Sequence, residues 1–396
     1  MNIVVVSQIF HPVPFRVNDI VQALTAAGHE VKVVTGLPDY GLPSIPKEYR
    51  WFRKRREEFF GARVIRVPTF ARRSGMLHRA LNYVSFVVSG WFYMSFTNKK
   101  EVDVIFCYET SPVLQAIPAI RLKKRTKKKL VLYCLDLWPE SLKAWKVEEE
   151  SWFYRRMAAV SRKIYRSCNA IPVSSPGFID YLVDVCGVPA ERVSYLPQHG
   201  EDDFDSVAGV YEDNQCVDFL FAGNIGAVQS VETIIEAVSL MKTDQPFKVH
   251  IVGDGSRLED CRRVAERGAA ADKVVFHGRR VFSEMPAFYR MADCFLISLA
   301  ADNAIGKTIP GKLQGYLSAG KPILASGGEE ILRLLETADA GKGCEAERPD
   351  LLAALMDDCA DHFEHYRLMG ENGKNYFDQN FTKTVFMDRI MKILES

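Results

Sequence analysis

The chain has 396 residues and a mass of 44.8 kDa; 47% of its residues are hydrophobic and 26% are charged. A chain of this length is usually too long to fold around one hydrophobic core, so we expect two domains. The composition excludes a disordered or fibrous protein. The formal net charge of +1 argues neither for nor against nucleic-acid binding. Nine cysteines without a C-x-x-C pair exclude a disulfide scaffold and a zinc ribbon and favour a reducing compartment.

The small net charge conceals two oppositely charged halves. Residues 1–200 contain 30 Lys and Arg against 17 Asp and Glu, whereas the rest of the chain contains 21 against 33. Such halves are expected to meet different partners, and a basic half can face phosphates or an anionic membrane surface. The first apolar run, Ile3–Val6, is short and lacks a basic leader. We therefore expect no signal peptide and a cytoplasmic protein.

The first half begins with a βαβ pattern. A β-branched run, Asn2–Ser7, leads into a loop with His11 and then a helical pattern over Val17–Ala27. Gly28 ends this helix, and Glu30–Thr35 is the next apolar run. This order implies a parallel sheet with a right-handed crossover. Two further strands are predicted in this half, at Asp103–Cys107 and Leu130–Leu135.

A second α/β set follows an acidic, aperiodic stretch, His199–Gln215, which we interpret as an interdomain linker. Its predicted strands are Val217–Ala222, Val249–Val252, Val274–Phe276, Cys294–Ser298 and Pro322–Ala325. The sequence thus predicts an α/β protein made of two consecutive doubly wound sets. The last stretch, Glu371–Ser396, is predicted to be helical.

Three segments of the basic half are candidates for membrane contact. Leu81–Phe96 is apolar and aromatic but too short for a full span, and Tyr49–Phe60 mixes aromatic with basic residues. Each has a plainer interpretation, as a buried helix and as a solvated basic face respectively. Together with the basic run Arg121–Lys129, they favour peripheral contact with an anionic membrane.

Two glycine turns of the second half are candidates for phosphate binding. Phe221–Gly226 and Ile251–Ser256 each follow a predicted strand, at the end where open α/β sheets bind ligands. Glycine lets backbone amides approach a phosphate, although a tight turn without a ligand would look the same. Neither turn matches the G-x-G-x-x-G fingerprint, and the chain has no Walker A motif. A nicotinamide-dependent dehydrogenase is therefore disfavoured.

The stretch Ala304–Ile323 is the most informative part of the chain. Two lysines, Lys307 and Lys312, bracket Pro310–Gly311, and a short helix is predicted from Lys312 to Ala319 with Gly320 as its C-cap. Lysines beside a helix N-terminus suit a diphosphate.

These motifs, in this order, resemble the family 4 retaining glycosyltransferases, especially bacterial O-antigen and capsule enzymes of the L-fucosamine transferase type. In the second half the resemblance rests on Ala304–Ile323, Gly253–Gly255, Val275–Gly278 and Ala292–Asp293. In the first half it rests on Gly28–Val31, Asp136–Ser141 and Leu196–Asp202.

The resemblance implies a GT-B fold: two Rossmann-like domains facing a cleft, with a final helix that returns to the N-terminal domain. Residues 1–200 would bind the acceptor, residues 201–375 the nucleotide sugar, and residues 376–396 would form the returning helix. The implied activity is that of a hexosyltransferase-type enzyme (EC 2.4). It would move a sugar, expected to be an N-acetylated hexosamine, from a UDP-sugar with retained configuration and without a metal.

The chain departs from this family at several positions. Two glutamates typical of the family fall, by register, on Lys307 and Gly315, so neither carboxylate is present. The usual Arg and Lys after the first strand are Asn224 and Gln229, and the histidine that often precedes the Asp136 motif is Leu135. We expect Lys307 and Lys312 to supply part of the missing positive charge. No general base can be assigned.

The predicted catalytic residues are Asp136, Glu140, Lys307 and Lys312, the first two orienting the acceptor hydroxyl. Each of those two has a plainer interpretation, Asp136 as a helix N-cap and Glu140 as a surface carboxylate. His11 is the predicted acceptor-site residue, and no residue is assigned to a metal because Asp203-Phe-Asp205 lies in the acidic linker. The predicted donor-binding residues are Gly223, Asn224, Gly226, Asp254, Arg279, Thr308 and Gln314.

The expected partners are a nucleotide-sugar donor and a polyprenyl-diphosphate-linked saccharide, met on the inner face of the cytoplasmic membrane. No protein cofactor and no nucleic acid are expected. Two other functions stay open: a nucleotide-sugar epimerase of the GT-B fold, and a non-catalytic nucleotide-sugar-binding subunit. The loss of both family glutamates favours the latter, whereas an epimerase would need carboxylates and histidines near Lys307 that the sequence does not show.

Overall fold

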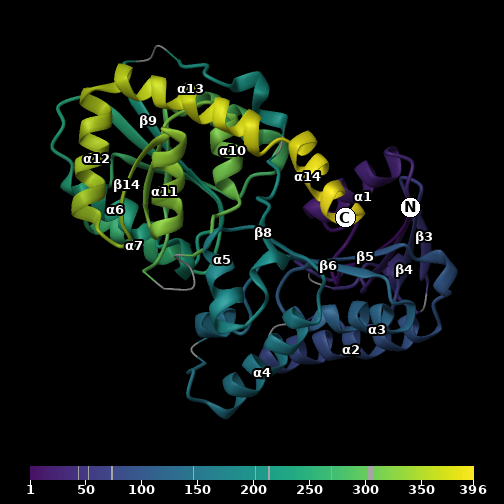
Figure 1. The fold of residues 1–396 in the computed structure, drawn as a ribbon. Helices are drawn as coiled ribbons and strands as arrows, with labels where there is room; N and C mark the ends of the chain where they lie inside the picture. The colour runs from purple at the N-terminus through teal and green to yellow at the C-terminus, as the bar shows by residue number, and fades with distance from the viewer. Residues whose placement is uncertain are drawn as a thin grey trace. The chain divides into compact units, whose positions relative to one another are not determined.

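A computed structural model describes the chain except residues 43, 52, 73–74, 146, 201, 213–214, 269 and 302–306. The described chain forms two compact units, one of residues 1–196 with 387–396 and one of residues 197–386. Each unit is built on its own parallel sheet with helices around it (Figure 1). The predicted pair of doubly wound α/β domains is confirmed.

The first unit contains an eight-stranded sheet in the order β3-β4-β2-β1-β5-β6-β7-β8. All neighbours pair in parallel except β3 and β4, which form an antiparallel edge. The bounds are β1 Asn2–Val6, β2 Glu30–Thr35, β3 Arg56–Phe59, β4 Ala62–Arg66, β5 Val104–Glu109, β6 Lys129–Cys134, β7 Ile171–Val173 and β8 Val193–Tyr195. Its helices are α1 Arg16–Ala26, α2 Met76–Phe96, α3 Ile117–Thr126, α4 Trp152–Arg166 and α5 Gly177–Asp180, together with the end of α14.

The central strands of this sheet are apolar on both faces because helices cover both. Val4, Val5 and Val6 of β1 and every residue of β5 are buried, which explains why these runs lack a polar alternation. Four strands of this sheet were not predicted, the edge pair β3 and β4 and the short strands β7 and β8. Because β3 and β4 contain many charged residues, the sequence was interpreted as a basic segment there and not as an edge hairpin.

The second unit contains a six-stranded, all-parallel sheet in the order β11-β10-β9-β12-β13-β14. Its strands are β9 Val217–Ala222, β10 Phe247–Val252, β11 Val274–Gly278, β12 Cys294–Ser298, β13 Ile323–Gly327 and β14 Gly341–Glu345. Its helices are α6 Val231–Leu240, α7 Leu258–Arg267, α8 Met285–Met291, α10 Lys312–Ser318, α11 Glu329–Ala338, α12 Pro349–Asp361 and α13 Phe363–Asn380. Apart from β14, each of these strands overlaps a predicted one.

One expectation about a connecting segment is wrong and another is right in part. The stretch interpreted as an interdomain linker, His199–Gln215, contains a 3-10 helix, Asp202–Val207, whose Phe204 and Val207 are buried in the core of the second unit. The stretch Glu371–Ser396 is helical as predicted, but it is divided between two helices, α13, which ends at Asn380, and α14 (Lys383–Glu395). Phe381, which follows Asn380, is buried against α13.

The helix α2 covers the expected apolar segment but is neither wholly buried nor wholly exposed. Phe86 and Met94 are buried, and at Gly90 the helix lies so close to α3 that a Cβ would stand 2.8 Å from Pro118 Cγ. Figure 1 shows α2 and α3 side by side on one face of the first sheet. Among the described residues, no helix has the length and apolarity of a membrane span.

Candidate functional site

Three adjacent turns line the carboxyl edge of the second sheet. They follow β9, β10 and β11, which are neighbours in the sheet, and each contains a glycine with positive φ: Gly223 at 151°, Gly253 at 149° and Gly278 at 69°. Backbone hydrogen bonds connect them, since the Gly223 amide donates to Val252 and the Gly253 amide to Gly278. The three turns therefore form one rigid backbone surface.

The turns pack too closely to admit side chains. A Cβ on Gly253 would lie 1.8 Å from the Gly223 carbonyl oxygen, and a Cβ on Gly255 would lie 2.1 Å from the Ile225 carbonyl oxygen. Glycine is required at these positions because backbone meets backbone there. The sequence predicted these glycines for the approach of a phosphate, whereas the structure shows that contact between the turns themselves requires them.

A pocket of about 710 Å³ opens on these turns. Its floor is backbone, its outer edge carries Arg279 and Arg280, and one wall is apolar and aromatic. In that wall Phe204 and Tyr289 stack with ring centroids 4.1 Å apart. The pocket is lined by Phe204, Ala222, Gly223, Asn224, Val252, Gly253, Asp254, Gly255, Arg279, Arg280, Phe282, Met285 and Tyr289.

The short helix α10 supports the first turn from behind. Lys312 and Tyr316 are four residues apart and so share a face of this helix. The Tyr316 hydroxyl donates to the Ala222 carbonyl (3.1 Å) and accepts from the Ala222 amide (2.8 Å), which fixes the residue before Gly223. A Cβ on Gly223 would lie 2.7 Å from Lys312 Nζ.

Lys312 is the most unusual cation of the described chain. Its Nζ is buried, has no hydrogen-bond partner among the described residues, and lies 3.6 Å from the centroid of the Phe221 ring. Burial lowers the pKa of this amine to about 7, because a buried ammonium loses its hydration. An unpaired buried amine beside a glycine turn is an unfavourable arrangement unless an anion completes it.

The other predicted donor residues of the first two turns occupy this neighbourhood. Asn224 Nδ2 donates to Gln229 Oε1 (3.0 Å) across Gly226, which is buried between them. Asp254 is exposed at the pocket, and its carboxylate accepts from the Gly255 amide (2.7 Å). The two positions where the family has cations are thus joined by a neutral hydrogen bond.

Arg279 and Arg280 differ in their partners. Arg280 lies 3.6 Å from Glu284 and donates to the His277 carbonyl (3.1 Å). No ion pair joins Arg279 to any described residue. Arg279 is therefore the guanidinium at the pocket edge that is open to a ligand.

Five predicted site residues of the second unit are not among those that line the pocket: Gly226, Lys307, Thr308, Lys312 and Gln314. Lys307 is exposed and Thr308 is half-buried, and residues 304–306 before them lie outside the described part of the chain. Gln314 is buried beside Gly200, and its Oε1 has no hydrogen-bond partner among the described residues. Of the two predicted lysines, the structure brings only Lys312 to the glycine turns.

The aromatic wall was missed from the sequence. Phe204 lay in the presumed linker, and Tyr289 lies on a helix without a recognised motif. Gly315 is one of the positions where the family has a glutamate. It lies behind this wall, and a Cβ on Gly315 would lie 3.4 Å from the Tyr289 hydroxyl oxygen. Only the tertiary contact reveals these residues.

In the first unit, Asp136 and Glu140 lie near the carboxyl edge of the sheet but differ in environment. Asp136 is half-buried two residues after β6 and accepts from the Ser141 hydroxyl (2.5 Å). Burial raises the pKa of Asp136, although hydrogen bonds from Ser141 and Ser111 oppose this. A carboxyl whose pKa is shifted by burial is a recognised feature of functional sites.

Glu140 is held by neighbouring side chains. It accepts from the Tyr154 hydroxyl (2.7 Å) and pairs with Lys143 (2.7 Å). Burial acts to raise the pKa of Glu140, but the hydrogen bonds from Lys143, Tyr154 and Tyr181 outweigh it and lower the pKa. Its carboxylate oxygens are therefore occupied by protein partners.

A buried carboxyl next to Asp136 was not predicted. Glu109 ends β5, the neighbour of β6, and is completely buried. Burial, followed by the nearby Asp136, raises the pKa of Glu109 well above its usual range. No signal in the sequence separated this glutamate from the rest of an apolar strand.

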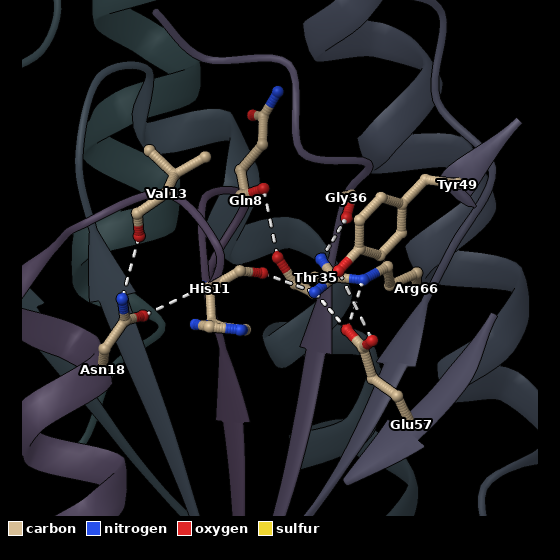
Figure 2. A network of polar contacts seen from close by, with 9 residues as sticks. All are labelled: Gln8, His11, Val13, Asn18, Thr35, Gly36, Tyr49, Glu57 and Arg66. Carbon is tan, nitrogen blue, oxygen red and sulfur yellow. Dashed lines mark hydrogen bonds and ion pairs between the residues drawn. The ribbon is translucent and has the colours of Figure 1, made fainter. Parts of the chain in front are cut away.

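His11 belongs to a polar network at the carboxyl edge of the first sheet (Figure 2). Its backbone amide donates to Asn18 Oδ1 (3.0 Å), and its carbonyl accepts from Arg66, which also pairs with Glu57. The dashed contacts in Figure 2 run through the backbone of His11, not its ring. The ring lies 4.7 Å from the Phe59 ring, and burial lowers its pKa.

Within the described residues, no group of three or more His, Cys, Asp or Glu side chains is arranged to hold a metal. The side chains of Asp203 and Asp205, which spell D-x-D in the sequence, lie outside the described part.

Both halves of the chain match families of known proteins. Residues 13–199 match the family described as "Glycosyl transferase 4-like domain", and residues 217–362 match "Glycosyl transferases group 1". The chain is 27% identical over 349 residues to the putative colanic acid biosynthesis glycosyl transferase WcaI of Escherichia coli (strain K12), covering 83% of this chain and 81% of that protein. It is 24% identical over 310 residues to the probable glycosyltransferase WbjE of Pseudomonas aeruginosa, covering 75% and 76%.

The fold is also similar to that of solved structures. The crystal structure of HepE from Anabaena, in complex with UDP and glucose, superposes with a TM-score of 0.69 at 13% identity and covers 100% of both chains. The two doubly wound units, the glycine turns and these matches define a glycosyltransferase with the GT-B fold. Within that class the chain is a GT4-type glycosyltransferase. The predicted fold and enzyme class are confirmed.

Proposed function

We propose that this protein transfers a sugar from a UDP-sugar to a lipid-linked saccharide during synthesis of a bacterial surface polysaccharide. The donor sugar is an N-acetylated hexosamine, the anomeric configuration is retained, and no metal takes part. The names of WcaI and WbjE support the glycosyl transfer, and that of WcaI supports a surface polysaccharide. The UDP and glucose bound to HepE support the donor class.

The observation that carries this proposal is the buried Lys312 amine behind the Gly223 turn. A diphosphate on the glycine turns accepts hydrogen bonds from backbone amides and receives positive charge from Lys312 and Arg279. This replaces the Arg and Lys that the chain lacks at Asn224 and Gln229. The base of the nucleotide stacks on the apolar wall around Phe282.

In the reaction, the bond between the anomeric carbon and the β-phosphate oxygen breaks, and UDP leaves with the electron pair. The acceptor oxygen bonds to the anomeric carbon and its hydroxyl proton is released. Negative charge grows on the diphosphate as the bond breaks, so fixed cations and amides lower the barrier more than they stabilise the bound donor. Lys312 supplies this charge from a desolvated position, where it acts most strongly.

The acceptor hydroxyl is oriented by the first unit. Asp136 is the better candidate of the two predicted carboxylates, because Glu140 is already bound by Lys143 and Tyr154. The His11 ring contacts the acceptor saccharide, and partial desolvation lowers its pKa, which favours the neutral imidazole at pH 7.

The test is UDP binding measured by calorimetry as a function of pH. Bound diphosphate favours the ammonium form of Lys312, so binding above pH 7 takes up a proton and the affinity falls as the pH rises. We expect about 0.5 proton taken up at pH 7, close to one at pH 8.5, and an affinity loss approaching tenfold per pH unit. Buffers of different ionisation enthalpy report the proton count directly.

The Lys312→Met variant is the matched control for that experiment. It should bind UDP weakly and without the proton uptake seen above pH 7, since methionine fills the space without titrating. An affinity that is independent of pH in the natural protein would contradict the role of Lys312. Absence of UDP binding at every pH, in folded protein, would overturn the proposed function.

Two alternatives differ in what they do with the donor alone. An epimerase converts a UDP-sugar without an acceptor, and a binding subunit holds it without turnover under any acceptor. Incubation with UDP-sugars alone should leave them unchanged if the protein is a transferase. The non-catalytic binding subunit is still an alternative because Lys307 and Gly315 stand where the family has glutamates.

The proposed site of action is the inner face of the cytoplasmic membrane, reached through α2. One face of this helix forms an exposed apolar stripe whose members are three or four residues apart, except for the adjacent Trp91 and Phe92, and α2 contains no acidic residue. Basic residues flank the stripe, including Arg121 on α3, which lies 4.7 Å from the Trp91 ring. The stripe consists of Leu77, Leu81, Val84, Val88, Trp91, Phe92 and Phe96.

We expect the protein to float with vesicles that contain phosphatidylglycerol and to float far less with phosphatidylcholine alone, because cations favour anionic lipid. The double variant Leu81→Asp/Val84→Asp should lose most of this binding. Val281→Asp, which changes an exposed apolar residue of the second unit, should retain it. Binding that ignores lipid charge, or equal loss in both variants, would contradict membrane docking through α2.

A further inference from the structure

A second pocket, of about 750 Å³, lies in the first unit along the edge of α2. One wall is formed by α2 residues that include Val88, Phe92 and Phe96, and the other by Ile65 and Val67 at the end of β4. We call this pocket the α2 groove. It is lined by Lys32, Arg56, Ile65, Arg66, Val67, Pro68, Val88, Ser89, Phe92, Tyr93, Phe96, Thr97, Asn98 and Glu101.

The α2 groove is continuous with the exposed stripe. Val88, Phe92 and Phe96 belong to both, so an apolar ligand that leaves a membrane surface along the stripe contacts the wall of the groove on these side chains. Contiguous exposed apolar surface of this kind marks an interaction site in a soluble domain.

The groove also connects the two edges of the first sheet. Val67 and Pro68 follow the end of β4 and so stand at the carboxyl edge, where open α/β sheets bind their ligands. Asn98 and Glu101 precede β5 and so stand at the amino edge. A chain-like ligand with its polar end at the carboxyl edge therefore has a continuous path along α2.

The charges around the groove favour an anion. Its one carboxylate among the described lining residues, Glu101, is paired with Lys32 and lies 3.9 Å from Arg63. Arg56 is exposed on the edge strand, and no ion pair joins it to any described residue. A second copy of this chain would bring the same cations against the rim, whereas the phosphate of a lipid complements them.

We propose that the α2 groove binds the hydrocarbon chain of the lipid-linked acceptor, with the phosphate of that lipid meeting Arg56. This rests on the proposed function, because it assigns to the acceptor a site for its lipid part. The apolar walls contribute free energy for each methylene group removed from water, and this contribution grows with chain length. The groove would thus select long-chain carriers over water-soluble saccharides.

The test uses two soluble probes, farnesyl monophosphate and isopentenyl monophosphate, below the concentration at which the former forms micelles. Calorimetry should show farnesyl monophosphate binding at least about 20-fold more tightly, because it buries ten more carbons. Phe92→Asp should weaken farnesyl binding by about tenfold or more and leave isopentenyl binding unchanged. Arg56→Ala should weaken both probes by a similar factor, since both carry the phosphate.

Leu368→Asp is the matched control, because Leu368 is an exposed apolar residue of a helix, α13, and belongs neither to the groove nor to the stripe. It should bind farnesyl monophosphate as the natural protein does. Equal affinity for the two probes, or equal loss in the two aspartate variants, would overturn the proposal. A dimer in sedimentation that Phe92→Asp dissociates would place a second copy in the groove instead.

UDP binding measured on the same samples separates this proposal from the function. Phe92 and Arg56 lie in the first unit, so their variants should bind UDP normally if they are folded. Chain-length selection without UDP binding would keep the groove and reject the donor site. UDP binding without chain-length selection would do the reverse.

Discussion

Replacing Lys312 by methionine is expected to lower kcat/KM for the UDP-sugar by about 10²–10³-fold, the usual effect of removing one charge-stabilising group. The residue lies behind the Gly223 turn, with its amine buried and unpaired among the described residues. The leaving diphosphate gains charge during the reaction, so most of the loss should appear in kcat. Steady-state kinetics with a radiolabelled donor would measure it.

The same variant should be more stable than the natural protein when no ligand is bound. The Lys312 pKa of about 7 lies below that of an exposed lysine, so the unfolded chain binds more protons than the folded one between pH 7 and 10.5. The free energy of unfolding of the natural protein therefore rises with pH in this window. Below the window Lys312 is charged in the folded protein, and the cost of burying that charge lowers the stability in full. At pH 7 the variant should gain about 1–3 kcal/mol in free energy of unfolding.

Two matched lysine variants complete the design. Lys248→Met changes an exposed lysine of the same unit and should leave both activity and stability nearly unchanged. Lys307→Met tests the other predicted lysine, which is exposed and outside the pocket, and we expect a smaller loss than for Lys312. A larger loss at Lys307 would transfer the charge-stabilising role to that residue. A Lys312→Met enzyme with normal kcat would remove Lys312 from the mechanism.

The second large effect is expected at the glycine turns. Gly253→Ala should abolish measurable UDP binding, a loss of about 100-fold or more, because its Cβ would lie 1.8 Å from the Gly223 carbonyl oxygen. The turns must separate to relieve this contact, and the amides that face the phosphates then lose their positions. The φ of 149° at Gly253 adds strain for any other residue, so we also expect about 2–4 kcal/mol of destabilisation.

Gly278→Ala is the matched control in the next turn. Gly278 also has positive φ, at 69°, but a Cβ there would have no heavy atom of the described residues within 4 Å. It should cost only about 1 kcal/mol of stability, the penalty of a left-handed backbone, and keep most of the UDP affinity. Thermal unfolding and calorimetry on both variants would separate the effect of the steric clash at Gly253 from the effect of backbone strain at a positive φ. Equal effects would show that close packing of the turns is not what the donor requires.

The α2 region shows how far local pattern can predict a surface. The apolar composition of Leu81–Phe96 favoured either burial or membrane contact, and the structure shows one buried and one exposed face. The buried face packs on α3, with Gly90 against Pro118. The basic edge hairpin β3–β4 was not predicted because a charged strand at an edge lacks the apolar run typical of central strands.

Local chemistry by itself determined the central strands of both sheets and the places of the glycine turns. Buried parallel strands appear as short β-branched runs, and a turn between strand and helix requires glycine where backbone approaches backbone, so both leave marks in consecutive residues. The two α/β sets and the turns at Gly223 and Gly253 were predicted on this basis.

Tertiary structure alone decided which charges and rings belong to the site. The sequence does not distinguish Lys307 from Lys312. In the structure Lys307 is exposed, whereas the Lys312 amine is buried against the Phe221 ring. Phe204 belongs to the stretch that the sequence predicts to be a linker, yet its ring stacks on the Tyr289 ring. The reason is physical: desolvation, ring stacking and pKa depend on atoms brought together from distant parts of the chain, and these are absent from any local pattern.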